Sequence, residues 1–513
     1  MTTQKNAPEV GREQWTGQLG FLLAAIGSAV GLGNIWRFPG VAYENGGGAF
    51  LVPYLVALLT AGIPILLLDY SLGHRFRGSA PLVFRRLGRR LEGLGWFQVA
   101  IAFVIATYYT VIIVWAIRYM LFSVNLAWGD DPTTFFVADF LQDAGTGYSG
   151  DFVGGIFWPM LGLWLVTLLV LGFGVAKGIE RLTKIFIPLL VVLFVVLVVR
   201  ALFLEGAAEG LNAFFTPDWS ALAQPGVWVA AYSQIFFSLS IAFGIMITYS
   251  SYLKRRANLV PVSYVAAFAN SSFELLAGIG VFATLGFMAA QQGVAVGDLE
   301  GLTGVALSFM TFPQIISMMP GGPVFGVLFF ASLTLAGFTS LISILQVVSA
   351  AFQEKFGLSR VQATAVIGGL CAVISLALFS TTTSLATLDT VDKYTNEVGV
   401  VASAILTCVL VGLVTRKVPT LRAHLNYVST ARLGSWWSAM ITVVVPLALA
   451  YILVTTAMEL FRQPYEDYPW SFVNGFGWGA IAFMVAVAVA FSLLPWRRPV
   501  DEFTPETLQE VTR

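Results

Sequence analysis

Long apolar runs separated by short polar connections fill most of this chain. A helix needs about 20 residues to cross a bilayer, and twelve runs are long enough: 17–44, 48–73, 96–124, 155–175, 182–204, 226–253, 261–290, 323–352, 362–380, 385–415, 436–460 and 472–495. The pattern therefore predicts an all-α membrane protein with twelve transmembrane helices.

Lysine and arginine gather in every second connection between these runs. The basic connections carry Arg75, Arg77, Arg85, Arg86, Arg89, Arg90, Lys177, Arg181, Lys184, Lys254, Arg255, Arg256, Lys355, Arg360, Arg416, Lys417, Arg422 and Arg432. The opposite connections hold almost none, and residues 291–322 contain no basic residue. Because positively charged loops stay in the cytoplasm, the alternation places both termini there and supports the count of twelve.

Composition agrees with a membrane protein and argues against other classes. Of the 513 residues, 57% are hydrophobic and 11% are charged, whereas soluble domains carry about 25% charged residues. The net charge is zero, so nothing indicates a nucleic-acid partner. Cys371 and Cys408 lie in apolar runs and form no evident disulfide or metal pattern. No cleavable signal is expected, since the first apolar run is too long for a signal core.

The first run is interrupted by residues that a lipid-facing helix would lack. Residues 27–39 read GSAVGLGNIWRFP, with glycines that weaken a helix and with the polar residues Asn34 and Arg37. Unwound backbone at membrane depth persists only where it lines a cavity or a bound ion. Gly27 and Gly31 also form a G-x-x-x-G pair suited to close helix packing, but this alternative does not account for Asn34 and Arg37.

The sixth run contains a second interruption. Residues 234–244 place several small and polar side chains at mid-membrane, among them Ser238 and Ser240. Alternatively, these serines only bond to carbonyls of their own helix. Runs one and six open two five-run halves, 17–205 and 226–415, which start from opposite sides of the membrane. Paired interrupted helices in two inverted halves mark a substrate site at the midplane.

Polar residues of neighbouring runs lie at the same depth. They are Tyr109, Asn270, Glu274, Thr339 and Ser340. Each has a structural alternative, such as an interhelical hydrogen bond for Asn270 or a packed ring for Tyr109. Together they supply many oxygens and one costly carboxylate, a set that suits a hard cation. Zinc or copper is not expected, because neither His74 nor His424 belongs to this group.

Several motifs, in this order, resemble the neurotransmitter:sodium symporter family. They are GLGNIWRFP at 31–39, ENGGGAF at 44–50, QIFFS at 234–238 and AGFTS at 336–340. The resemblance implies the LeuT-type fold, in which two inverted five-helix repeats contain unwound helices one and six and two further helices are peripheral. The remaining parts would be a tail with an inner-gate segment at 1–16, an extracellular loop at 206–225, the last two helices at 416–498 and a C-terminal tail at 499–513.

The resemblance also implies two sodium sites and a substrate site. Sodium site one would use the backbone oxygen of Ala29 and the side chains of Asn34, Ser238 and Asn270, together with the substrate carboxylate. Sodium site two would use backbone oxygens of Gly27, Val30 and Ala336 and the hydroxyls of Thr339 and Ser340. The substrate would be surrounded by Ala29, Leu32, Gly33, Ile105, Tyr109, Phe237, Ser238, Ser240, Phe243 and Ile344, with its carboxylate held by Tyr109 and the amides near residues 32–33.

A gate on each side of this site is implied as well. Arg37 and Asp392 would close the outer side, with Phe237 as a lid. Arg12 and Trp15 would lock the cytoplasmic side against Glu354 and Tyr252. Relatives often have aspartate at the Glu354 position, so that pair is expected to be looser here.

Two departures from the family narrow the expected activity. Monoamine carriers have aspartate at the position of Gly31, so here the substrate must bring its own carboxylate to the sodium. Chloride-dependent members have a neutral serine at the position of Glu274, so here a fixed carboxylate takes the place of chloride. The alternative for Glu274 is that it only forms hydrogen bonds with neighbouring side chains.

These features predict a sodium-coupled, chloride-independent symporter of a neutral, small to medium hydrophobic α-amino acid. The expected coupling ions are two sodium ions, with no organic cofactor, no enzyme activity and no nucleic-acid partner. The expected location is a bacterial inner (plasma) membrane, where the chain is embedded in the lipid bilayer, and association as a homodimer is left open. The alternatives are a carrier of a β- or γ-amino acid or taurine, a channel, and a transport-dead amino acid sensor.

Overall fold

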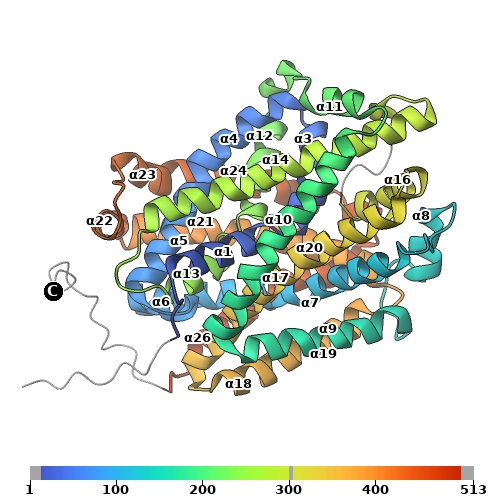
Figure 1. Cartoon of the computed structure of the whole chain (residues 1–513). Coiled ribbons are helices and arrows are strands. Elements are labelled where there is room, and N and C mark those ends of the chain that lie inside the picture. Colours follow the sequence, from blue (N-terminus) through green and yellow to red (C-terminus); the bar gives the residue numbers. More distant parts are fainter. Residues whose placement is uncertain (1–12, 300–303, 498–513) are drawn as a thin grey trace, which may run out of the picture.

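Apolar helices make up the computed structural model, which describes residues 13–299 and 304–497 (Figure 1). Ten uninterrupted helical spans are long and apolar enough to cross a membrane: Gly48–Phe76, Arg89–Phe122, Gly154–Gly172, Val175–Leu202, Leu259–Gln292, Gly322–Phe356, Arg360–Phe379, Ser384–Val414, Ser435–Asp467 and Trp470–Leu493. Within the described ranges, β-structure is limited to two isolated bridges. The predicted all-α membrane fold is confirmed.

The first predicted segment is a broken helix. It consists of α1 (Gln18–Ala29), α2 (Leu32–Trp36) and α3 (Phe38–Glu44), and the chain bends by 54° at the break after α1. Val30 and Gly31 are extended there. The break falls where the glycines of residues 27–39 weaken the helix.

The sixth predicted segment is broken as well. It consists of α12 (Pro225–Ser238) and α13 (Ile245–Ser250). Residues 239–244 between them form a linker in which Ser240, Ala242 and Gly244 have positive φ angles of 51°, 67° and 89°. With the bent first segment and the ten spans, these two helices account for the twelve predicted segments.

Two long helices form the centre of the bundle. They are α7 (Glu92–Phe122) and α17 (Gly322–Phe356), which pack against each other. The most apolar stretch of Arg89–Phe122 is 83% buried, whereas that of the last span, Trp470–Leu493, is only 17% buried. The span Trp470–Leu493 therefore lies at the periphery of the bundle, where its apolar side chains can contact lipid.

The basic connections lie at one end of the bundle, and the connections with almost no basic residues lie at the other end. Figure 1 shows α6 (Ala80–Leu87) and α22 (Val418–Val428), which lie in basic connections, at one end. It shows α8 (Pro132–Thr134) and α16 (Phe312–Met318), which lie in connections nearly free of basic residues, at the other. The arrangement agrees with the alternation of charge along the sequence.

Candidate functional site

The two helix breaks face each other through a chain of amide and hydroxyl groups. Asn34 Nδ2 donates to Asn270 Oδ1 over 2.8 Å, and Asn270 Nδ2 donates to Ser238 Oγ over 3.1 Å. The backbone N–H of Gly31 donates to Asn34 Oδ1 over 2.8 Å. The structure therefore brings three of the side chains predicted for sodium site one together, and all three are buried. Ala29 is the last residue of α1, directly before the break.

A second group of oxygens lies where α1 ends beside α17. The Ser340 hydroxyl lies 3.4 Å from the Gly27 carbonyl oxygen and 3.2 Å from that of Ser28. Thr339 Oγ1 donates to the Ala336 carbonyl over 3.0 Å. These contacts place the hydroxyls predicted for sodium site two beside the end of α1, and Val30 follows as its C-cap.

Gly27 shows that close packing also acts here. A Cβ at this position would lie 2.6 Å from Cδ1 of Ile187 and 3.5 Å from Cβ of Thr339. Ile187 belongs to α10 (Glu180–Leu202). The packing alternative for the glycines therefore holds at Gly27, next to the oxygen group described above.

The space beside Gly31 is bounded by polar groups of two other helices. A Cβ on Gly31 would lie 3.0 Å from the Tyr109 hydroxyl and 3.1 Å from Ser340 Oγ. The backbone N–H of Leu32 donates to the Tyr109 hydroxyl over 3.4 Å. A side chain at residue 31 would thus point toward the hydroxyl predicted to hold a substrate carboxylate.

Three apolar side chains predicted for the substrate site are buried: Ile105, Phe243 and Ile344 have 5%, 6% and 4% exposure. The ring of Phe237 lies directly against Gly33, where an added Cβ would be 2.0 Å from a ring carbon. The hydroxyl of Ser240, also predicted for the substrate site, donates to the Ser28 carbonyl over 2.8 Å.

Arg37, predicted for the outer gate, lies near two carboxylates, those of Glu397 and of the predicted partner Asp392. Its guanidinium stacks on Phe237, 4.7 Å from the ring centroid, and lies 3.9 Å from the Glu397 carboxylate. Lys393 pairs with the same carboxylate at 2.9 Å. Asp392 instead accepts a hydrogen bond of 2.8 Å from Asn396 Nδ2, although it remains close enough to Arg37 for an electrostatic interaction.

Trp15, which the resemblance predicts as part of the inner gate, is 1% exposed. Its indole N–H donates to the Tyr249 carbonyl over 2.9 Å, and its backbone N–H donates to the Tyr252 carbonyl over 3.2 Å. Glu354 accepts hydrogen bonds from the backbone N–H and the hydroxyl of Ser79, at 2.8 and 2.6 Å. Arg12, the fourth predicted member of this gate, lies outside the described residues.

A further ion pair near Trp15 was missed by sequence reasoning. Arg360 holds both carboxylate oxygens of Glu13, one of them through Nε at 2.7 Å. Arg360 Nη1 also donates to Gln346 Oε1 over 3.0 Å, and Gln346 donates to the Tyr252 hydroxyl over 2.7 Å. Glu13 precedes Trp15 by two residues, so this network ties the segment before α1 to α17.

Glu274 is fully buried and held by donors from two other segments. Gln234 Nε2 donates to its Oε1 over 2.7 Å, and the Tyr54 hydroxyl donates to its Oε2. Tyr54 also contacts Ser271 Oγ at 2.8 Å. Tyr54 gave no signal in the sequence because it is one aromatic residue in an apolar run, whereas Gln234 opens the QIFFS motif.

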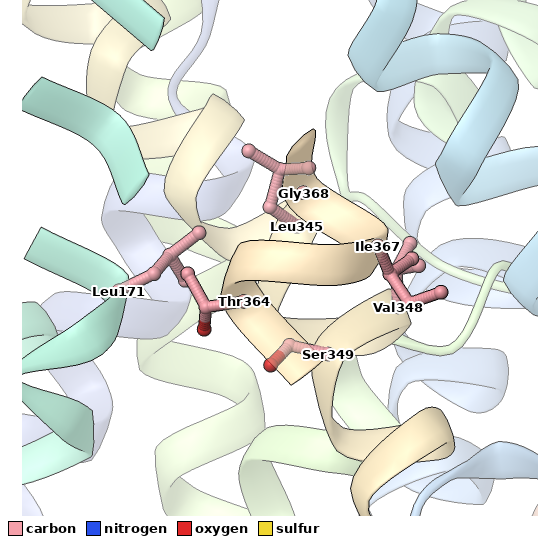
Figure 2. A pocket seen from close by; sticks show the side chains of 7 residues that line it. All are labelled: Leu171, Leu345, Val348, Ser349, Thr364, Ile367 and Gly368. Carbon is pink, nitrogen blue, oxygen red and sulfur yellow. The ribbon is translucent and has the colours of Figure 1, made fainter. Parts of the chain in front are cut away.

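A small pocket lies between α9 (Gly154–Gly172), α17 and the start of the span Arg360–Phe379 (Figure 2). It is lined by Leu171, Leu345, Val348, Ser349, Thr364, Ile367 and Gly368. Most of its lining is apolar, and none of the predicted site residues takes part. Figure 2 shows two hydroxyl side chains, Ser349 and Thr364, at its edge.

Comparison with known proteins gives a consistent result along the whole chain. The model of the sodium:neurotransmitter symporter family matches residues 12–139 and 130–498. An uncharacterized sodium-dependent transporter of Methanocaldococcus jannaschii is 39% identical over 484 residues, which cover 94% of this chain and 97% of that protein. The human sodium- and chloride-dependent creatine transporter 1 is 33% identical over 72% of this chain and 65% of its own length.

A solved structure has the same fold. The crystal structure of MhsT in complex with L-phenylalanine matches with a TM-score of 0.74 and 32% sequence identity. The match covers 87% of this chain and all of the MhsT chain.

Proposed function

Because this chain belongs to the sodium:neurotransmitter symporter family, we propose that it is a sodium-coupled, chloride-independent symporter of a neutral α-amino acid. The family consists of membrane transporters driven by sodium, not of enzymes. The proposal therefore concerns the substrate, the ions and the sites. Alternating access would move the substrate, since groups on both sides cover one central region.

One observation carries the proposal: oxygen groups from three segments meet at the two helix breaks. Asn34, Asn270 and Ser238 are linked by hydrogen bonds of 2.8 and 3.1 Å. Helix breaks expose carbonyl oxygens, and neutral oxygen ligands suit a hard monovalent cation better than a transition metal. We assign sodium site one to this group and sodium site two to the oxygens around Ser340.

Two sodium ions would give a strong driving force. A tenfold sodium gradient is worth about 1.4 kcal/mol, and 100 mV adds about 2.3 kcal/mol for each charge. Two ions would therefore supply roughly 7 kcal/mol, enough to concentrate a zwitterion by up to about five orders of magnitude.

The space beside Gly31 supports a substrate that carries a carboxylate. Glycine leaves room in front of the Tyr109 hydroxyl and Ser340 Oγ, and a substrate carboxylate placed there would reach sodium site one. Ile105, Phe243 and Ile344, which are buried, would supply an apolar wall that favours an uncharged side chain. MhsT, the structural relative, was solved with L-phenylalanine.

Glu274 supports independence from chloride. Two sodium ions and a zwitterion leave excess positive charge in a region of low dielectric constant. The donors Gln234 and Tyr54 converge on the Glu274 carboxylate, so a fixed negative charge lies in a place suited to an anion. The relatives that carry creatine or GABA are described as sodium- and chloride-dependent.

We further propose that the protein lies in the plasma membrane with both termini in the cytoplasm, where its basic connections would face. Association as a homodimer is compatible with the apolar, little-buried last span. A substrate from the β- or γ-amino acids or taurine is the main alternative. It is favoured by the GABA transporter of Drosophila melanogaster, which is 34% identical over 67% of this chain and 40% of its own length.

Uptake by purified protein in liposomes tests the proposal. We expect uptake of a neutral α-amino acid to be electrogenic and to stop when external sodium is replaced by potassium. Uptake that continues unchanged in potassium would exclude sodium symport. A thermal-shift screen of the twenty amino acids, GABA and taurine, with and without sodium, would separate the α-amino acid proposal from its alternative.

A further inference from the structure

A second buried carboxylate lies beside the linker of the sixth segment, away from the proposed ion sites. Asp69 belongs to α5 (Ile63–Phe76) and has no exposed surface. Its Oδ2 accepts the backbone N–H of Ala242 over 3.1 Å. Among the described residues, no group donates to its other oxygen, Oδ1. Nothing in the proposed transport reaction uses this residue.

Ala242 is held from two sides at this point. Its N–H donates to Asp69 of α5, and its carbonyl accepts the Ser403 hydroxyl over 2.5 Å. Ser403 belongs to α21 (Val401–Val409). Ala242 has a φ of 67°, a left-handed conformation that costs an alanine energy. The two contacts therefore fix the linker in a shape that it would not keep alone.

An ionised Asp69 would be very unfavourable here. Burying an isolated carboxylate costs far more than burying a neutral polar group, and one amide donor leaves most of that cost in place. The groups that interact electrostatically with Asp69 are the Tyr70 hydroxyl on its own helix and the Cys408 thiol of α21, both of which are ordinarily neutral at physiological pH. Five titratable groups on helices packed against α5 bond elsewhere: Glu274 to Tyr54 and Gln234, His424 to His74, Tyr249 to Ser343, Arg85 to Glu92, and Arg86 to backbone carbonyls of residues 76–77.

A bound metal ion fits this place less well than a proton. The neighbouring Ala242 carbonyl is taken by Ser403, and the Ala242 N–H presents a positive end to the carboxylate. Gln98 contributes a second unpartnered oxygen beside the linker, 3.7 Å from a Cβ built on Gly244. Two side-chain oxygens are few for a hard cation, which takes six or more, whereas a proton needs only one carboxylate oxygen.

We propose that Asp69 is a proton-binding site, protonated in this conformation, that exchanges its proton with water when the linker of residues 239–244 moves. The inference rests on the alternating-access part of the proposed function. Protonation adds one hydrogen to Oδ1 and removes the buried charge, while Oδ2 keeps its bond to Ala242. Movement of the linker removes the amide donor and opens the carboxyl group to water, where the proton leaves as hydronium.

The linker connects this proton site to sodium site two. Ser240, two residues before Ala242, donates to the Ser28 carbonyl over 2.8 Å, and Ser340 donates to the same oxygen over 3.2 Å. The conformation that assembles these oxygens is therefore also the one that encloses Asp69. Sodium and the proton should stabilise the same state and bind cooperatively.

The sign of the pH effect on sodium affinity tests this coupling. We expect the apparent sodium affinity of the purified full-length protein, measured by sodium-dependent thermal stabilisation at constant ionic strength, to rise as the pH falls. The limit for one linked proton is about tenfold per pH unit. Asp69→Asn keeps an acceptor for Ala242 and carries no charge, so its affinity should stay high and flat with pH. Asp69→Glu keeps a titratable group and should retain the slope.

Two results would overturn the proposal. One is an equal pH slope in wild type and Asp69→Asn. The other is a sodium affinity that falls as the pH falls and loses this dependence in Asp69→Asn, because that result would make the carboxylate a cation ligand.

If sodium does not stabilise the wild type at any pH, that result refutes the proposed sodium symport and leaves the proton site undecided. Infrared spectroscopy then tests the proton site directly. The band of a protonated carboxyl group at about pH 7 should be lost in Asp69→Asn and retained in the matched control Glu274→Gln. A spectrum that Asp69→Asn leaves unchanged would show that Asp69 is ionised and would refute the proton site.

Discussion

The guanidinium of Arg37 lies 3.9 Å from the carboxylate of Glu397. The family resemblance places Asp392 opposite this arginine, but here Asp392 is bonded to Asn396. Arg37 and Glu397 are 25% and 21% exposed, so water screens the pair only in part. Glu397 is therefore a second candidate for the carboxylate that closes the outer side, and a comparison of two variants can separate the roles.

We expect Glu397→Gln and Asp392→Asn to impair transport more than sodium-supported substrate binding. Each change removes a negative charge near Arg37 and weakens closure, while the ion and substrate groups remain. A partly exposed ion pair is worth up to about 1 kcal/mol, so binding should change by no more than about fivefold. Radioligand binding and liposome uptake measure the two effects.

Asp467→Asn, a change at an exposed carboxylate at the end of the span Ser435–Asp467, serves as the control and should leave both measurements intact. If Asp392→Asn is indistinguishable from wild type while Glu397→Gln loses uptake, the gate pair is Arg37–Glu397. If neither variant changes uptake, no carboxylate at these positions acts as an outer gate.

The twelve segments and both helix breaks could be predicted because they follow from local composition. Glycines and polar residues within an apolar run weaken the helix where they occur, as residues 27–39 show. The alternation of basic and non-basic connections independently supported the number of twelve segments. The thickness of the bilayer and the helix propensity of the backbone determine structure over stretches of about 20 residues, and a local sequence pattern reveals features on that scale.

Side-chain partners could not be predicted in the same way. Glu13 and Arg360 are 347 residues apart and His74 and His424 are 350 apart, and no local pattern pairs such residues. Asp69 was overlooked because one carboxylate in a long apolar run shows nothing of its surroundings. Only the folded chain shows that Oδ1 of Asp69 has no donor among the described residues.

The Glu13–Arg360 pair should hold the cytoplasmic side closed. Arg360→Gln removes the charged fork, and Arg360→Lys keeps the charge but loses the two-point contact with the carboxylate. Both should release the segment around Trp15, with the larger effect in Arg360→Gln. We expect faster hydrogen exchange in residues 13–20 and a sodium affinity lowered by up to about fivefold, as for a loss of about 1 kcal/mol.

Arg432→Gln, at an exposed basic residue of another connection, is the matched control for this pair. It removes the same charge and should alter neither measurement. Unchanged exchange around Trp15 in Arg360→Gln would mean that the pair does not contribute to closure.

His424 should make the protein less stable in acid. It lies in α22, outside the membrane spans, where burial and the nearby Arg75 and Arg77 lower its pKa to about 3 from 6.5. A base with a lowered pKa contributes stability above pH 6.5, and this contribution is lost as the pH falls from 6.5 toward 3. The slope is on the order of 1 kcal/mol per pH unit.

Melting temperatures measured between about pH 7 and pH 5 check this expectation. In His424→Gln the acid-dependent loss should shrink, because the variant has no group to protonate at this position. The melting temperature of His424→Gln at the higher pH measures separately the loss of the contact between His424 Nε2 and His74 Nδ1, which are 2.9 Å apart in the wild type. Equal acid sensitivity in both proteins would assign the loss to other groups.

Glu274 gives the sharpest test of ion coupling. The wild type should transport equally well in chloride and in gluconate, because its fixed carboxylate balances the charge of the sodium ions. Glu274→Ser removes that carboxylate but leaves the donors Gln234 and Tyr54, which can hold an anion. We therefore expect Glu274→Ser to require chloride, with uptake in gluconate lower by more than about tenfold, equivalent to about 1.4 kcal/mol. Glu274→Gln fills the space without restoring a charge, so chloride should rescue it much less than Glu274→Ser. A wild type that fails in gluconate would refute the role of Glu274, and so would a Glu274→Ser variant that works equally in both salts.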